Sequence, residues 1–154
     1  MKSSITTTEI FKYILAFTLI FSAFLALAIT YNKVYKLKNE VLAIIEKYEG
    51  VTDKSLGIIN NYLKSSGYNT LGHCDDGEYG ISSLDNTNLS LDNSKKHYYC
   101  LNSNRISGKN GDKIYYDVKL FFKFNLPFIG ELLTFKITGE TKAISLYSDS
   151  QLLS

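Results

Sequence analysis

The sequence predicts an α+β protein in which one long N-terminal helix packs on a small antiparallel β-sheet. Two observations predict this class. Apolar residues recur at spacings of three and four before Gly50, and they alternate with polar residues in two segments near the C-terminus. We find no internal repeat and no second apolar run of spanning length, so one modest domain is expected to follow the helix.

The first part of the helix has the length and composition of a membrane span. Lys12 and Lys33 enclose 20 residues that carry no charge. A helix that rises about 1.5 Å per residue needs roughly 20 apolar residues to cross the hydrocarbon core. We therefore interpret residues 1–12 as a short leader and polar N-terminus, and residues 13–32 as the transmembrane part of the helix.

Residues 33–49 are expected to continue this helix as an amphipathic extension, because neither Gly nor Pro occurs before Gly50. The sequence thus predicts one helix from about Thr8 to Glu49, roughly 60 Å long at 1.5 Å per residue. Its outer half must bury an apolar stripe against the domain formed by residues 50–154. That stripe consists of Val34, Leu37, Val41, Ile44, Ile45 and Tyr48.

The domain is expected to contain a second helix and a sheet. Thr52 is the predicted N-cap of this helix, with Asp53 in its first turn, and Gly67 is the predicted stop. Residues 66–110 are rich in Gly, Asn, Asp and Ser, which predicts mostly loop. Two half-buried strands are predicted in the segments KIYYDVKLFFKFN and LLTFKITGETKAI, and a third strand in HYYCLNSNRI. The short connections between these segments predict an antiparallel meander. The residues expected to face the long helix are Ile114, Tyr116, Val118, Leu120, Phe122, Phe124, Leu133, Phe135, Ile137 and Ala143.

Cys74 and Cys100 are the two cysteines, and they do not form a C-x-x-C pair. A disulfide in an oxidising compartment is the simplest assignment, which places the domain outside the cytoplasm. Such a bond would close a loop of about 25 residues and add on the order of 3 kcal/mol of stability. The alternative is two free thiols in a cytoplasmic domain, which the distribution of lysines around the span favours. Two lysines precede the span and three follow it, namely Lys2, Lys12, Lys33, Lys36 and Lys38.

The composition and motifs do not indicate an enzyme. A net charge of +2 without a dense basic face argues against nucleic acid as a partner. The adjacent His73 and Cys74 of GHCDDGEYG do not make a nucleophile–base pair by sequence order alone. The acidic residues of the loops could bind calcium, but they lack the EF-hand spacing, so we favour a solvated loop and predict no metal site and no cofactor. They are Asp75, Asp76, Glu78, Asp85 and Asp92.

A long, half-apolar N-terminal helix on a small antiparallel sheet is the architecture of type IV pilins and pseudopilins. The segment TTTEIFKYILAF resembles the Glu-plus-aromatic start of TadE-like minor pilins from tight-adherence pilus systems. The segment LFFKFNLPFIGELLTFKITGET resembles the strand, Leu-Pro turn and strand near their C-termini. The middle of the chain, from about Gly50 to Asp112, has no counterpart in this resemblance.

The resemblance implies a non-catalytic, single-pass subunit of the cell membrane with an extracytoplasmic domain. Its implied partners are the membrane, a prepilin peptidase and other pilin-like subunits, which contact the N-terminal helix in a surface pilus or a related secretion or adhesion apparatus. Family processing usually follows Gly and leaves Glu as the fifth mature residue. Counting back from Glu9 places the cut between Ser4 and Ile5, with Ser4 where the family has Gly.

Glu9 has two compatible interpretations. Thr6 and Glu9 fit the S/T-x-x-E capping box at the start of a helix. In a polymer, an apolar helix bundle would isolate the Glu9 carboxylate, and the free amine of Ile5 on a neighbouring subunit could pair with it.

Two other interpretations of the N-terminus remain open. Ala26-Leu27-Ala28 matches the small-residue site of a cleaved secretory signal, and the apolar run could also be a plain signal anchor. Either would make the chain a secreted or anchored binding module that does not polymerise.

Overall fold

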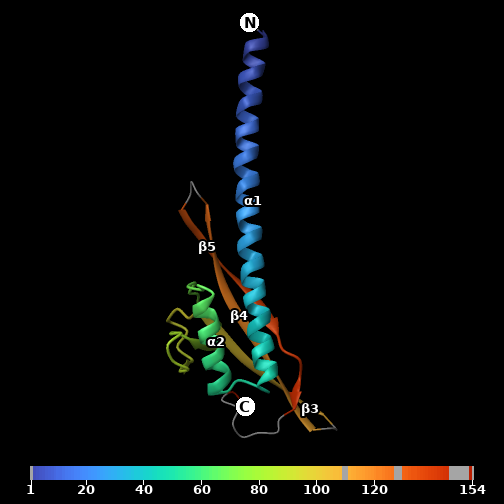
Figure 1. Ribbon diagram of the computed structural model, residues 1–154, viewed down its shortest axis with the longest axis vertical. Helices are drawn as coiled ribbons and strands as arrows, with labels where there is room; N and C mark the ends of the chain where they lie inside the picture. The colour runs from blue at the N-terminus through green and yellow to red at the C-terminus, as the bar shows by residue number, and fades with distance from the viewer. Residues whose placement is uncertain (1, 109–110, 127–129, 146–152, 154) are drawn as a thin grey trace.

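The computed structural model describes residues 2–108, 111–126, 130–145 and 153 (Figure 1). It has the α+β, pilin-like architecture that the sequence predicts, with a long N-terminal helix beside a small antiparallel sheet. Helix α1 spans Lys2–Lys47 without interruption. The predicted start at Thr8 is therefore too late by several residues, and the predicted end at Glu49 lies two residues beyond the last helical residue.

Helix α1 ends in a short turn that leads directly into α2 (Asp53–Ser65). The N–H of Gly50 donates to the Ile45 carbonyl at 2.9 Å, and Glu49 adopts a left-handed φ of 55°. Thr52 is the N-cap, as predicted, because its side chain accepts a hydrogen bond from the Ser55 N–H. The Ser55 hydroxyl accepts in turn from the Thr52 N–H, which completes a reciprocal capping box.

The sheet is antiparallel and its strands follow the order β2-β1-β3-β4-β5, with β6 also paired to β4. Strands β3, β4 and β5 form the predicted meander. Two short strands lie in the region predicted to be mostly loop, because two or three residues are too few to show alternation. The bounds are β1 (Tyr79–Ile81), β2 (Leu89–Ser90), β3 (Tyr99–Gly108), β4 (Gly111–Leu126), β5 (Gly130–Glu140) and β6 (Ile144–Ser145).

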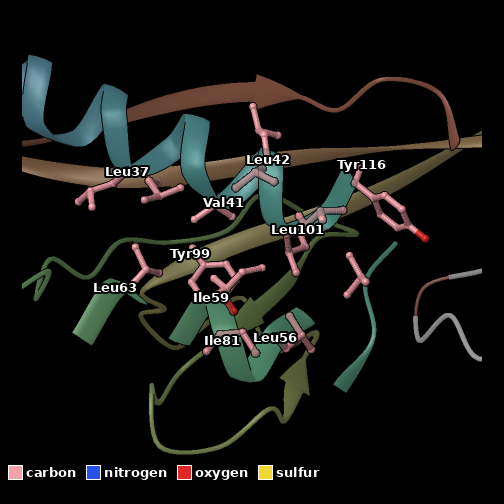
Figure 2. Packing of buried hydrophobic residues seen from close by; sticks show 14 of the residues in the cluster. Leu37, Val41, Leu42, Leu56, Ile59, Leu63, Ile81, Tyr99, Leu101 and Tyr116 are labelled. Atoms are coloured by element: carbon pink, nitrogen blue, oxygen red, sulfur yellow. The ribbon is translucent and has the colours of Figure 1, made fainter. Parts of the chain in front are cut away.

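Both helices cover the same face of the sheet, and the core lies between them and the strands (Figure 2). Alternate residues of β4 point into this core, as predicted, and Tyr99 and Leu101 of β3 join them through their pairing with Leu120 and Val118. The buried residues of the α1 stripe and of β4 on this face are Val34, Leu37, Val41, Leu42, Ile45, Ile114, Tyr116, Val118, Leu120 and Phe122.

The apolar face of β5 is only partly as predicted. Ile137 is buried, whereas Phe135 is 38% exposed and stacks on Phe122 with ring centroids 5.3 Å apart. The prediction for Ala143 is wrong, because β5 ends at Glu140 and Ala143 follows it as an exposed residue. The side chains of Phe124 and Leu133 lie outside the described part of the chain.

A glycine of β5 brings the sheet close to α1. A Cβ atom at Gly139 would lie 2.6 Å from Cδ of Lys38 and 2.8 Å from Cδ1 of Leu42. Glycine therefore allows the strand backbone to approach the helix at this point. The Lys38 stem is packed there while its ammonium lies 4.4 Å from the centre of the Tyr35 ring.

Candidate functional site

The N-terminal half of α1 presents apolar side chains that nothing else in the described chain covers. From Thr7 to Lys47 the helix is long and apolar enough to cross a membrane, by length and composition. Tyr13 and Phe17 are 71% and 69% exposed, respectively. Hydroxyl groups in this half donate back to the helix, as Thr18 does to the Ile14 carbonyl at 2.8 Å and Thr30 to the Ala26 carbonyl at 2.9 Å. The hydroxyls of Thr18 and Thr30 thus carry no unmet hydrogen-bond donor into an apolar environment.

Glu9 lies in this half and is paired within its own helix. Its Oε1 atom accepts a hydrogen bond from Lys12 Nζ at 3.1 Å, and both side chains are exposed. The capping-box interpretation is wrong in this structure, because α1 begins at Lys2 and Thr6 lies inside it. Ser4 and Ile5 belong to the first turns of the helix backbone, and their side chains lie outside the described part.

The predicted disulfide is present on the face of the sheet opposite the helices. Cys74 and Cys100 are bonded, with Cα atoms 5.6 Å apart, and pack against the buried Phe121 ring. The bond fixes the segment before β1 to strand β3. Cys74 is consequently half of a disulfide and presents no thiol for nucleophilic chemistry.

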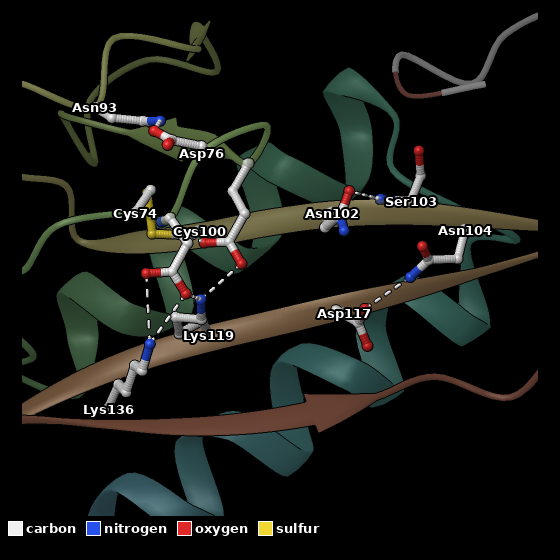
Figure 3. Close-up of polar contacts among 12 residues, drawn as sticks. Cys74, Asp76, Asn93, Cys100, Asn102, Ser103, Asn104, Asp117, Lys119 and Lys136 are labelled. Atoms are coloured by element: carbon white, nitrogen blue, oxygen red, sulfur yellow. Dashed lines mark hydrogen bonds and ion pairs between the residues drawn. A yellow bond between two sulfur atoms is a disulfide. The ribbon is translucent and has the colours of Figure 1, made fainter.

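An ionic cluster lies beside the disulfide (Figure 3). Lys119 of β4 points away from the helices, as its strand position predicts, but it is buried instead of solvated. Its Nζ atom binds Asp75 Oδ2 at 2.5 Å and Glu78 Oε1 at 2.6 Å. Lys136 of β5 binds the same Asp75 oxygen at 3.0 Å. One acidic loop is thus held on the sheet by lysines of two strands.

The pKa values of this cluster are shifted in the directions expected for ion pairs. Hydrogen bonds from Lys119 and then Lys136 hold the pKa of the Asp75 carboxyl below its ordinary value. Burial lowers the pKa of the Lys119 ammonium, but the hydrogen bonds to Asp75 and Glu78 outweigh burial and leave that pKa above its ordinary value. Both groups are therefore charged near neutral pH.

The acidic residues considered for calcium bind other groups of the protein. Asp76 accepts from the Asn93 side-chain amide at 3.1 Å, and Asp85 binds Lys64 at 2.5 Å. Asp92 accepts from Ser94 and Lys95, and these hydrogen bonds lower the pKa of its carboxyl. Cys74, Glu78 and Cys100 form the one group of three candidate ligands in the described residues, but its sulfurs form the disulfide and Glu78 binds Lys119.

The two histidines do not form a catalytic pair. His73 is exposed, with Nδ1 3.3 Å from the Asn93 carbonyl oxygen. His97 is fully buried, with Nε2 3.0 Å from the Asp92 carbonyl oxygen. Each ring thus contacts a backbone carbonyl of the same loop, and neither faces a thiol in the described structure.

Two residues that the sequence did not single out hold this region together. The Tyr68 hydroxyl lies 2.9 Å from the carbonyl oxygens of Tyr98 and Phe121 and accepts from the Phe121 N–H at 2.8 Å. Burial raises the pKa of this phenol. Asn60 of α2 accepts from the Tyr99 hydroxyl at 2.8 Å and donates to the Asn86 carbonyl at 2.7 Å. No local motif marks either residue, because their partners lie far away in sequence.

Comparison with known proteins adds no assignment: no protein-family model, no curated protein and no solved structure matches this chain.

Proposed function

We propose that the chain is a non-catalytic, membrane-anchored, pilin-like subunit, similar to the TadE-type minor pilins, of a pilus or a related secretion or adhesion apparatus. One observation carries this proposal. Helix α1 is unbroken, its second half is built into the domain core, and its first half offers an apolar surface that the described chain leaves uncovered. Such a surface needs lipid or other helices around it.

The proposed mechanism uses these two environments in turn. The bilayer stores the subunit as a monomer, because the apolar half of α1 matches the hydrocarbon core. In the polymer the same surface packs against the helices of other subunits. Because the two halves share one helix, moving the first half into a bundle carries the sheet domain with it. The disulfide supports a location of this domain in an oxidising compartment outside the cytoplasm.

Glu9 is the proposed assembly contact. Beside Lys12 its carboxylate is partly neutralised, but a helix bundle would remove it from water, and an isolated buried charge is costly. Cleavage between Ser4 and Ile5 by a prepilin peptidase would create an amine at Ile5. The Ile5 amine of a neighbouring subunit would then supply the opposite charge.

The first experiment is the intact mass and N-terminal sequence of the protein from the membrane fraction of its native cells. We expect the mature chain to start at Ile5. A start at Ile29 would indicate a secreted domain instead. An intact Met1 in every assembled particle would contradict the proposed processing.

A second experiment tests assembly directly by comparing Glu9→Gln with Lys12→Gln. We expect Glu9→Gln to abolish recovery of the protein in sheared surface filaments while its amount in the membrane fraction and its disulfide stay unchanged. Lys12→Gln is the matched control, since it breaks the same intrahelical ion pair but leaves the carboxylate. Equal loss of assembly in the two variants would show that Glu9 acts only through Lys12. Normal assembly of both would favour an anchored binding module.

A further inference from the structure

A cavity of about 350 Å³ opens between the end of α2 and the loops that flank the short strand β1. Its walls are Lys64 of α2, the turn at residues 67–69, the loop at residues 82–85 and Tyr98, which precedes β3. This volume lies at the lower end of the range for small-molecule sites. The walls belong neither to the apolar part of α1 nor to the ionic cluster, so the cavity has no part in the function proposed above.

The walls of the cavity are fixed by contacts between residues far apart in the sequence. Asn60 of α2 donates to the Asn86 carbonyl at 2.7 Å, which ties the loop after β1 to the helix. The Tyr68 hydroxyl donates to the Tyr98 carbonyl at 2.9 Å, which fixes the opposite wall. A ligand therefore meets preformed walls, and its binding does not have to order these loops.

The charges at the rim of the cavity balance each other. Among the described residues, the charged side chains that line the cavity are Lys64 and Asp85. Lys64 Nζ binds Asp85 Oδ1 at 2.5 Å, so the lining carries no net charge. An anion or a cation would have to separate this pair to find its own counter-charge, and the lining therefore favours a neutral ligand.

The other side chains of the cavity combine polar groups with an apolar surface. Asn69 and Ser82 are exposed, and their side chains make no hydrogen bond to the described part of the chain. The Asn69 amide and the Ser82 hydroxyl each offer both a donor and an acceptor. Beside them, Leu84 and Tyr98 are half-buried and pack against the core, so that their outer sides give the cavity an apolar surface. A fitting ligand carries donors, acceptors and an apolar face at once.

We propose that this cavity binds a neutral saccharide unit, namely one pyranose ring of a polysaccharide or glycan. The hydroxyls of such a ring both donate and accept hydrogen bonds, as Asn69 and Ser82 require, and its C–H groups form an apolar face that packs on Tyr98. A purely apolar ligand would leave the amide and the hydroxyl without partners, which is costly. The inference goes beyond the proposed function, because it concerns the domain and does not depend on α1 or on polymerisation.

The test uses the full-length protein in a detergent without a sugar headgroup, and the methyl glycosides of glucose, galactose and N-acetylglucosamine as probes. Saturation-transfer NMR detects binding, and amide chemical shifts locate it. We expect at least one glycoside to bind and to shift the amides of residues 67–69 and 82–85. Asn69→Ala and Tyr98→Leu should each weaken this binding about two- to tenfold, because each removes one contact with the sugar. Asn88→Ala is the matched control, since Asn88 is exposed but lies outside the cavity.

Three results would overturn the inference. They are no saturation transfer to any of the glycosides, unchanged affinity in both Asn69→Ala and Tyr98→Leu, and stronger shifts of the same amides with inorganic phosphate, which would make the cavity an anion site. Filament recovery from cells that carry Asn69→Ala separates this test from that of the proposed function. We expect normal recovery, because Asn69 lies outside α1, so a failure of sugar binding and a failure of assembly are read independently.

Discussion

The two parts of α1, residues 13–32 and residues 33–47, both carry large apolar side chains but lie in opposite surroundings. Ile20 in the first half is 59% exposed, whereas Ile45 in the second half is completely buried against the sheet and α2. Charged residues mark the difference, since they occupy one side of the second half and are missing from residues 13–32. An apolar residue of α1 therefore stabilises the domain only in the part of the helix whose other face carries charged residues. In the uncharged part, an apolar residue is available for contact with lipid or with another helix.

The largest effect should come from truncating a buried residue of the second half. We expect Ile45→Ala to lower the free energy of unfolding of the domain by about 2–5 kcal/mol, because it leaves a cavity in a close-packed core. The measurement is chemical unfolding of the full chain in mild detergent. Ile20→Ala is the matched control, and we expect it to change that free energy by less than about 0.5 kcal/mol. Equal losses in the two variants would contradict the division of the helix.

Removing the disulfide should have the next largest effect on stability. It should leave the packing of α1 and α2 on the opposite face of the sheet unchanged. We expect the double variant Cys74→Ser, Cys100→Ser to lose about 3 kcal/mol of stability, because the bond no longer restricts the unfolded chain. Unfolding of the wild-type protein with and without a reductant provides the control, and the two comparisons should agree. Unchanged stability after reduction would show that packing on Phe121 alone fixes the loop.

The ionic cluster should contribute less than the disulfide. We expect Lys119→Met to destabilise the domain by about 1.5–3 kcal/mol, because Glu78 and Asp75 lose a charged hydrogen-bond donor. Lys113→Met, on an exposed part of the same strand, is the control and should have little effect. Comparable losses in both variants would indicate that β4 tolerates no change of this kind and that the ion pair is not the cause.

The ion pair between Lys119 and Asp75 predicts a pH dependence of the free energy of unfolding, and the sign of this dependence follows from the two pKa shifts. The pKa of the Asp75 carboxyl is lower in the folded protein than the 3.8 of the unfolded chain, so the pair stabilises the fold above pH 3.8. This stability is lost as the pH falls through the pKa of the folded state. The pKa of the Lys119 ammonium is higher in the folded protein than the 10.5 of the unfolded chain, so the pair stabilises the fold below pH 10.5. This stability is lost as the pH rises through the pKa of the folded state. The difference in stability between wild type and Lys119→Met should therefore be largest between these limits. A difference that does not vary with pH would contradict the pairing.

The smallest effect concerns the turn between the two helices. We expect Thr52→Ala to cost about 1 kcal/mol, because it leaves the Ser55 N–H at the start of α2 without its acceptor. Thr138→Ala on the exposed face of β5 serves as the control in the same unfolding experiment. A loss no larger than that of the control would show that the hydrogen bond from the Ser55 N–H to the Thr52 side chain does not stabilise the start of α2.

The sequence predicted those features that depend on neighbouring residues. The buried stripe from Val34 to Ile45, the inward face of β4 and the cap at Thr52 all follow from local periodicity or a short motif. The capping box at Thr6 failed for the same reason, since the motif also fits inside a helix and nothing in residues 2–5 breaks one. Local patterns thus identify the faces of elements better than their ends.

The features missed from the sequence depend on partners far along the chain. Lys119 has the strand position of a solvated residue, but Asp75 reaches it from 44 residues away and the disulfide loop covers it. Tyr68 reaches Phe121 across 53 residues, and Asn60 reaches Tyr99 across 39. Such contacts form only when the sheet is complete, and no spacing rule along the chain encodes them.

The unbroken course of α1 also has a mechanical consequence. No Gly or Pro occurs between Lys2 and Lys47, so the helix has no residue at which it would bend easily. β4 runs beside its second half (Figure 1), so a pull along the helix axis loads the interface with the sheet in shear. The buried side chains from Val34 to Ile45 must then slide past the strands together instead of separating one by one. A force or a twist applied at the membrane end is thus delivered to the domain as a rigid-body displacement.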